Sequence, residues 1–150
     1  MKQHLIFLVA LLTTLSMVNA IPYYQLDKRA TTFGPCFTGS PFPITVSLQP
    51  DPPVPGQNCI FTVTGTIDSG INPGAQIVVQ GFDTAGNQIG DPIVTDICSI
   101  PGEDPCPATS FSITDTVTIS ASLSGTYSIA VSILSETGAV LGCSMGTVTG

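Results

Sequence analysis

Apolar residues alternate with serine and threonine along much of this 150-residue chain, and this alternation limits its fold more than any other feature. Period-two alternation puts the apolar side chains on one face of a strand and the polar ones on the other. Glycine and proline separate the runs, as is typical of turns between strands. The runs are 44–48, 59–67, 76–80, 88–98, 111–119, 127–133 and 141–145. They predict an all-β sandwich of two antiparallel sheets with about seven strands.

The charge distribution excludes several classes of function. The only basic residues are Lys2, His4, Lys28 and Arg29, whereas nine of the ten acidic residues (all but Asp27) follow Arg29. The body of the chain therefore has no imidazole for general base catalysis, no cation for a phosphate and no basic patch for nucleic acid. We expect neither nucleic-acid binding nor chemistry that needs a basic side chain.

The N-terminal part has the pattern of processing signals. A basic start, an apolar run over 5–15 and a small-residue Val-Asn-Ala end predict a signal peptide over 1–20. We interpret 21–29 as a propeptide, because its Lys28-Arg29 end resembles the site cut by kexin-type proteases of the fungal secretory pathway. A coincidental basic pair is the alternative. The mature domain would then span 30–150, enough for one ordinary domain.

Five cysteines in a chain with a predicted signal peptide indicate disulfides and one cysteine left over. The spacing alone does not fix their connectivity. We expect Cys36 to pair with Cys143 and Cys98 with Cys106, while Cys59, within a strand run, stays free and buried. A zinc site is disfavoured, because there is no Cys-x-x-Cys pair and the body has no histidine. We expect no metal and no cofactor.

One position interrupts the alternation. Asp115 falls on the apolar side of its run, between Ile113 and Val117. A buried carboxylate is costly unless it is hydrogen-bonded. Either a bulge or strand end lets Asp115 reach water, or the carboxylate makes a polar contact at the mouth of a cavity.

The proline-rich connection resembles a motif of a known family. Segment 48–56, Leu-Gln-Pro-Asp-Pro-Pro-Val-Pro-Gly, followed by Phe-Thr-Val-Thr-Gly-Thr at 61–66, is similar to the second-strand motif of the ML lipid-recognition domain. The most similar branch is that of the fungal phosphatidylglycerol/phosphatidylinositol transfer proteins, related to the lysosomal sterol carrier of the Niemann–Pick type C pathway. Further matches follow in the family's order: Asp-Ile-Cys at 96–98 with Cys-Pro at 106–107, Ser-Gly-Thr-Tyr-Ser at 124–128, and Cys143, whose family partner is an early cysteine, here Cys36.

This resemblance, from about residue 36 to 148, implies a non-enzymatic immunoglobulin-like sandwich. Its sheets would splay apart at one edge and hold the apolar part of a lipid. The residues alone do not distinguish such a cavity from a filled core. Among the inward candidates, mid-strand placement favours Phe61, Phe111 and Val131; the proline-rich 98–106 loop is either a gate or a stapled hairpin. The full candidate set is Phe61, Val63, Ile77, Val79, Phe111, Ile113, Val117, Ile129, Val131, Ile133 and Met145.

The chain departs from the family in lacking lysine after its predicted processing site. An anionic head group would find no cation to pair with, so a sterol or an acyl chain with its head in water is favoured. We expect a secreted or secretory-pathway (including vacuolar) monomer that binds a sterol or phospholipid and touches membranes transiently. The alternative is a filled interaction domain at a cell surface or wall. A glycosidase built on a carboxylate such as Glu103 or Asp104 is disfavoured, since no spacing selects a pair.

Overall fold

Eight strands and one short 3-10 helix make up the regular structure. The computed structural model describes residues 31–36, 44–100 and 106–149. The elements are β1 (Thr32–Pro35), β2 (Thr45–Gln49), β3 (Asn58–Ile71), β4 (Gln76–Phe82), β5 (Gln88–Asp96), η1 (Ile97–Ser99), β6 (Ala108–Thr118), β7 (Tyr127–Leu134) and β8 (Val140–Val148). Within these ranges no helix is both long and apolar enough to cross a membrane.

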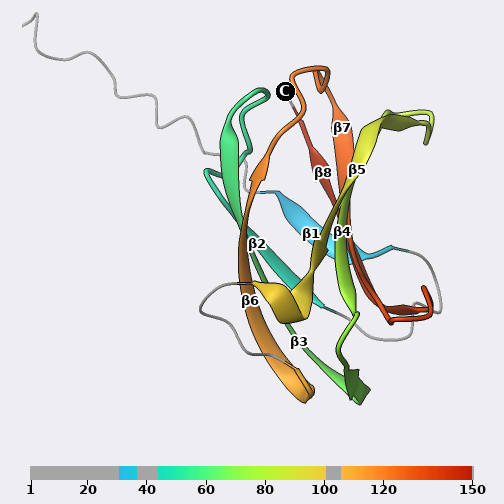
Figure 1. Cartoon of the computed structure of the whole chain (residues 1–150). Helices are drawn as coiled ribbons and strands as arrows, with labels where there is room; N and C mark the ends of the chain where they lie inside the picture. Colours follow the sequence, from blue (N-terminus) through green and yellow to red (C-terminus); the bar gives the residue numbers. More distant parts are fainter. Residues whose placement is uncertain (1–30, 37–43, 101–105, 150) are drawn as a thin grey trace, which may run out of the picture.

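The strands form two antiparallel sheets that face each other (Figure 1). One sheet has the order β1-β8-β7-β4-β5, and the other has the order β2-β3-β6. Each lateral edge of the sandwich therefore brings together two edge strands of different sheets. At one edge β1 faces β2, and at the other β5 faces β6. Among the described residues no backbone ladder joins the sheets, so side-chain packing and the covalent connections hold them together.

The predicted two-sheet sandwich is confirmed, and the seven predicted runs correspond to β2 to β8. Strand β1 was not predicted, because its four residues, Thr-Phe-Gly-Pro, show no alternation and include two weak strand formers. Pairing with β8 holds it in place. The strand predicted over 88–98 ends at Asp96. Asp96 Oδ1 accepts a 2.9 Å hydrogen bond from the Cys98 backbone N–H and so caps η1.

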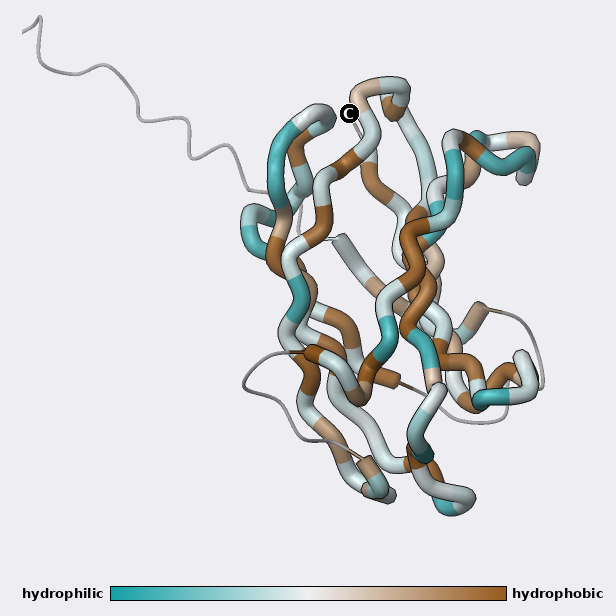
Figure 2. Tube along the Cα trace, in the orientation of Figure 1, coloured by the Kyte–Doolittle hydropathy of each residue, from teal (hydrophilic) through white to brown (hydrophobic). Residues whose placement is uncertain are grey.

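The apolar residues of both sheets meet in one continuous core. Phe61 and Val63 of β3 and Val131 of β7 are fully inaccessible to solvent. Figure 2 shows hydrophobic residues recurring along the strands of both layers. Threonine and serine occupy most of the outer positions of the three-stranded sheet, where Thr62 is paired with Thr114 and with Ser47. The alternation of apolar and polar residues in the sequence thus corresponds to the division between the core and the surface of the sandwich.

The two expected disulfides are present. Cys36–Cys143 ties the end of β1 to β8, and Cys98–Cys106 links η1 to the start of β6. Cys59 is free and buried. The predicted signal peptide, the propeptide and part of the 98–106 loop lie outside the described residues. Within the described ranges no three potential ligand residues cluster to form a metal site.

Candidate functional site

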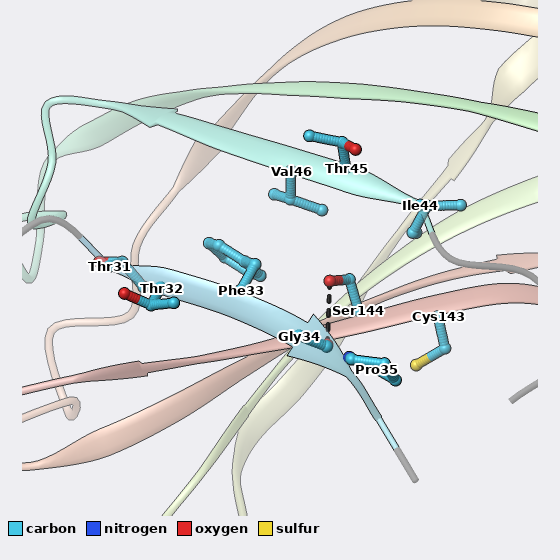
Figure 3. A pocket seen from close by; sticks show the side chains of 10 residues that line it. All are labelled: Thr31, Thr32, Phe33, Gly34, Pro35, Ile44, Thr45, Val46, Cys143 and Ser144. Carbon is cyan, nitrogen blue, oxygen red and sulfur yellow. Dashed lines mark hydrogen bonds between the residues drawn. The ribbon is translucent and has the colours of Figure 1, made fainter. Parts of the chain in front are cut away.

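A cleft opens between the two sheets at the β1/β2 edge. Its volume is about 470 Å³ and it is partly open to solvent. Figure 3 shows its walls, which come from β1, β2 and β8. The cleft is lined by Thr31, Thr32, Phe33, Gly34, Pro35, Ile44, Thr45, Val46, Cys143 and Ser144.

Phe33 and Val46 form the apolar walls and point toward each other across the cleft (Figure 3). The Phe33 ring lies over Gly146, its register partner on β8. A Cβ atom placed on Gly146 would lie only 3.0 Å from Phe33 Cε1 and Cε2, so the glycine makes room for the ring. Because Ile44 and Val46 also belong to the buried core, the floor of the cleft is continuous with the sandwich interior.

The packing around Gly65 connects this floor to the predicted pocket. A Cβ atom on Gly65 would lie 3.0 Å from Phe111 Cζ and 3.3 Å from Ile44 Cγ2. Phe111 therefore packs over Gly65 next to Ile44, one of the residues that line the cleft.

Hydroxyl groups and a backbone carbonyl form the polar part of the cleft. Ser144 Oγ donates a 3.0 Å hydrogen bond to the Gly34 carbonyl (Figure 3). Thr31 Oγ1 donates to Asp51 Oδ1 at 2.7 Å. No basic side chain lies in the described ranges. The cleft can thus exchange hydrogen bonds with a neutral polar group, but no side chain there offers a positive charge to an anionic one.

The predicted pocket residues are brought together, but in the packed interior. Ten of them belong to the buried core, and the exception is Met145. Three of the ten, Val79, Val117 and Ile129, line a void of about 30 Å³ at the β5/β6 edge. This volume is comparable to that of a single water molecule. None of the eleven predicted residues lines the larger cleft.

The register of β7 and β8 corrects the placement of Met145. Met145 pairs with Ala130, whereas the inward-facing Ile129 and Val131 pair with Gly146 and Ser144. Residues directly opposite each other share a face of the sheet, so Met145 lies on the outer face. The prediction was wrong because the inward positions of β8 carry small residues, and a one-residue shift exchanges the two faces.

Asp115 lies on the inner face, opposite Phe61 in the register of β3 and β6. The register continues unbroken through this pair and shifts only between Thr66 and Ile71, so no bulge occurs at Asp115. Strand β6 is an edge strand, which leaves Asp115 half-buried. Thr95 Oγ1 of β5 donates a 2.9 Å hydrogen bond to Asp115 Oδ2 and so bridges the two sheets. Asp115 thus makes a polar contact, as one of the two alternatives expected, but it lines neither the β1/β2 cleft nor the void at the β5/β6 edge.

Sequence reasoning missed the cleft because half of it belongs to β1. Ile44 and Val46 were recognised as inward residues of a strand, but nothing in their run indicates which element faces them. The phenyl ring of Phe33 sits in a segment without alternation. The one available signal was Cys36, whose disulfide to Cys143 draws the preceding residues against β8.

Comparisons with known proteins agree with this fold. The ML domain family model matches residues 30–149. A Niemann-Pick type C2 protein from Japanese carpenter ant is structurally similar, with a TM-score of 0.57 and 12% sequence identity over 79% of this chain and 98% of that chain. Chicken MD-1, crystallised with lipid IVa, gives a TM-score of 0.54 and 12% identity over 78% of this chain and 87% of its own. No curated protein sequence matches significantly. The chain belongs to the ML domain family.

Proposed function

We propose that this protein binds a lipid and holds its apolar part in the β1/β2 cleft. The observation that carries the proposal is an open inter-sheet cleft of about 470 Å³ whose floor is part of the apolar core. This volume falls in the range of roughly 300–1,000 Å³ that is typical of small-molecule sites. The β5/β6 edge offers only about 30 Å³, too little for an acyl chain. The ML family fold and the lipid-bound MD-1 neighbour give further support.

Burial of apolar surface would supply most of the affinity. If binding removes about 300 Å² of the lipid's apolar surface from water, the hydrophobic effect contributes roughly 7 kcal/mol to the binding free energy, at about 25 cal/mol per Å². Lost translational and rotational freedom reduces the net value. Deeper insertion requires the sheets to separate, because the core behind Ile44 is filled. We therefore expect the bound chain to widen the sandwich at the β1/β2 edge.

The charge of the protein favours a neutral ligand. Lining residues provide hydroxyls and carbonyls but no cation, which suits a sterol or an acyl chain whose head stays in water. The strongly acidic body should also be repelled by anionic membranes at low salt. The resemblance of the sequence to the fungal phosphatidylglycerol/phosphatidylinositol transfer proteins is therefore a better guide to ancestry than to the ligand that this chain binds. We propose transient contact with neutral membranes and transfer of lipid by a monomer.

The two disulfides favour an oxidising location, outside the cell or in the secretory pathway. The mature domain would begin at residue 30, after loss of the signal peptide and propeptide. In this role the cleft residues bind and shield the lipid, and we assign no catalytic residue and no enzymatic activity.

One observation favours a second candidate, a non-enzymatic interaction domain at a cell surface or wall. The interior between the sheets is closely packed, with Phe61, Ile113 and Ile133 essentially inaccessible. A filled sandwich of this kind needs no ligand for stability. Its partner would be a protein or a polysaccharide, and no lipid would be taken up.

Native mass spectrometry of the protein secreted from a eukaryotic host separates the two candidates. We expect a co-purifying mass that solvent extraction releases, or uptake of a sterol or phospholipid from neutral vesicles. Phe33→Ala should weaken uptake about tenfold, because it removes an apolar wall of the cleft. Phe82→Ala is the matched control, since Phe82 is also half-buried but lies on β4, away from the cleft. A bare mass and no uptake would favour the interaction domain.

A further inference from the structure

Two aspartates link the two layers of the sandwich, one at each lateral edge. At the β1/β2 edge, Asp51 Oδ1 accepts hydrogen bonds from Thr31 Oγ1 at 2.7 Å and from the Thr31 backbone N–H at 2.9 Å, and Oδ2 lies 3.0 Å from the same nitrogen. At the β5/β6 edge, Thr95 Oγ1 donates to Asp115 Oδ2 at 2.9 Å. Both edges are thus closed by a threonine donor and an aspartate acceptor, but only Thr31 also lines the cleft (Figure 3).

The Asp51 carboxylate is held on a rigid part of the chain. Asp51 lies in the connection between β2 and β3 with a proline on either side, and each proline ring fixes one backbone dihedral. The Pro50 carbonyl accepts a 3.6 Å hydrogen bond from the buried Cys59 thiol of β3. The Pro53 carbonyl accepts one from the Tyr127 hydroxyl of β7 at 3.4 Å. The connection is therefore fastened to the core, and the acceptor has a fixed position.

Strand β1 has few other holds on the three-stranded sheet. Its backbone pairs with β8, and the Cys36–Cys143 disulfide fastens it to the same strand. Among the described residues, the contacts from Thr31 to Asp51 are the only hydrogen bonds between segment 31–36 and the opposite layer. The remaining contact across this edge is the packing of side chains around the cleft. Movement of β1 away from β2 therefore has to break the contacts to Asp51.

We propose that Asp51 is a latch on the lipid site, whose hydrogen bonds to Thr31 hold the β1/β2 edge closed and break when the edge opens to admit the apolar part of a lipid. This role rests on the proposed lipid-binding function. Because the core behind Ile44 is filled, a lipid chain inserted beyond the cleft must move β1 away from β2. Contacts of 2.7–3.0 Å do not survive such a movement. The latch thus stabilises the closed sandwich and not the lipid-filled one.

A latch changes binding in the opposite direction from a wall residue. When a ligand binds only the open form, its apparent Kd is the intrinsic Kd divided by the fraction of open protein. Loss of the latch raises this fraction, so uptake becomes faster and the apparent Kd falls, by about tenfold for one hydrogen bond to a charged group. Asp51 does not line the cleft, so its removal deletes no contact with the lipid. Loss of a residue that only supports the cleft wall would instead weaken binding.

The matched variants Asp51→Ala and Asp115→Ala test this prediction. Each removes an aspartate acceptor that joins the two layers, at opposite edges, and neither residue lines the cleft. Stopped-flow uptake of a fluorescent sterol and an equilibrium titration give the rate and the apparent Kd. We expect Asp51→Ala to take up sterol about tenfold faster and to bind it more tightly than wild type. Asp115→Ala should stay within about twofold of wild type, since distant sites act independently.

Three results would overturn the latch. They are a rate and an apparent Kd for Asp51→Ala equal to those of wild type, weaker binding by Asp51→Ala, and an equal gain in both variants, which would indicate a general loosening of the sandwich.

The Thr31 amide reports the latch in wild-type protein and decides the question even if Asp51→Ala does not fold. Its N–H is bonded to Asp51, so its exchange with D₂O, followed by NMR, requires the latch to open. We expect exchange at least about tenfold slower than in a short peptide of the same sequence. Exchange should become faster when sterol is loaded, although a bound ligand ordinarily slows it. Exchange at the peptide rate, or slower exchange after loading, would refute the latch.

Failure of the proposed function gives a different result from failure of the latch. If no form of the protein takes up lipid, the proposed function fails, and the role of Asp51 in binding fails with it. Slow exchange at Thr31 would then still show that Asp51 holds this edge closed. If lipid is bound but the Thr31 amide and the two variants behave alike, the function stands and the latch is wrong.

Discussion

The two disulfides should differ in what their removal costs. Cys36–Cys143 closes a loop with a sequence separation of 107, and Cys98–Cys106 closes one of only 8. A cross-link stabilises a protein mainly by reducing the entropy of the unfolded chain, and the effect grows with the logarithm of loop length. The paired changes Cys36→Ala/Cys143→Ala and Cys98→Ala/Cys106→Ala therefore compare a long loop with a short one in the same protein.

Loop-closure entropy gives the expected magnitudes. At 25 °C the long loop contributes about 4.8 kcal/mol to the free energy of unfolding and the short loop about 2.5 kcal/mol. With a urea m-value of about 1.5 kcal/mol/M, the unfolding midpoints should fall by about 3.2 M and 1.7 M. Equilibrium urea unfolding of both variants, with equal m-values as the check on the denatured state, measures the difference directly.

The same pair of variants tests the location of the site. Cys143 lines the cleft and Cys36 follows β1, so loss of this disulfide should loosen the cleft wall and weaken lipid retention. Cys98 and Cys106 contribute nothing to the cleft lining and serve as the control. If the Cys36→Ala/Cys143→Ala variant is already unfolded in buffer while the Cys98→Ala/Cys106→Ala variant is folded, the result agrees with the expected order of stability. A short-loop variant that is the less stable of the two would refute the entropic reasoning.

Three further predictions concern individual contacts. Thr95→Val should lower the free energy of unfolding by about 1–2 kcal/mol in urea titrations, because Asp115 loses its donor from the other sheet. Cys59 should resist thiol reagents at pH 8 until urea unfolds the protein, since burial raises its pKa and excludes the reagent. Hydrogen bonds from the Asn87 side chain and backbone lower the pKa of Asp83 below its ordinary value. The turn formed by residues 83–87 should stay ordered above the ordinary aspartate pKa and lose its order as the pH falls through the lower, folded-state pKa of Asp83. An NMR titration of Asp83 and Asn87 would show this.

Strand alternation was sufficient to predict the sandwich, because the faces of its strands differ so clearly in polarity. Phe61 and Val63 are inward in the sequence pattern and fully buried in the fold. Met145 shows the limit of this reasoning. Small residues such as Gly142, Ser144 and Gly146 face inward on its strand, and the larger Met145 faces outward, so composition pointed to the wrong face and only the pairing with β7 shows which face is inward.

The cleft could not be predicted, because it is a property of two edge strands and not of one run. Val46 is an ordinary inward valine until Phe33 faces it from the other sheet. Phe33 is held there by β8 pairing and by the space over Gly146, neither of which has a local sequence signal. Long-range pairing, set by register, decides where a sandwich is filled and where it is open.

Photo-crosslinking of a bound lipid tests the central claim most directly. A sterol or fatty acid with a diazirine on its apolar part would be loaded and irradiated. The adducts would be mapped by mass spectrometry of chymotryptic peptides, because no lysine or arginine follows Arg29 and trypsin therefore has no site there. The account predicts adducts on the segments that carry Phe33, Ile44 and Val46, the apolar lining of the β1/β2 cleft. Adducts confined to β5 and β6, or none above the level of denatured protein, would contradict it.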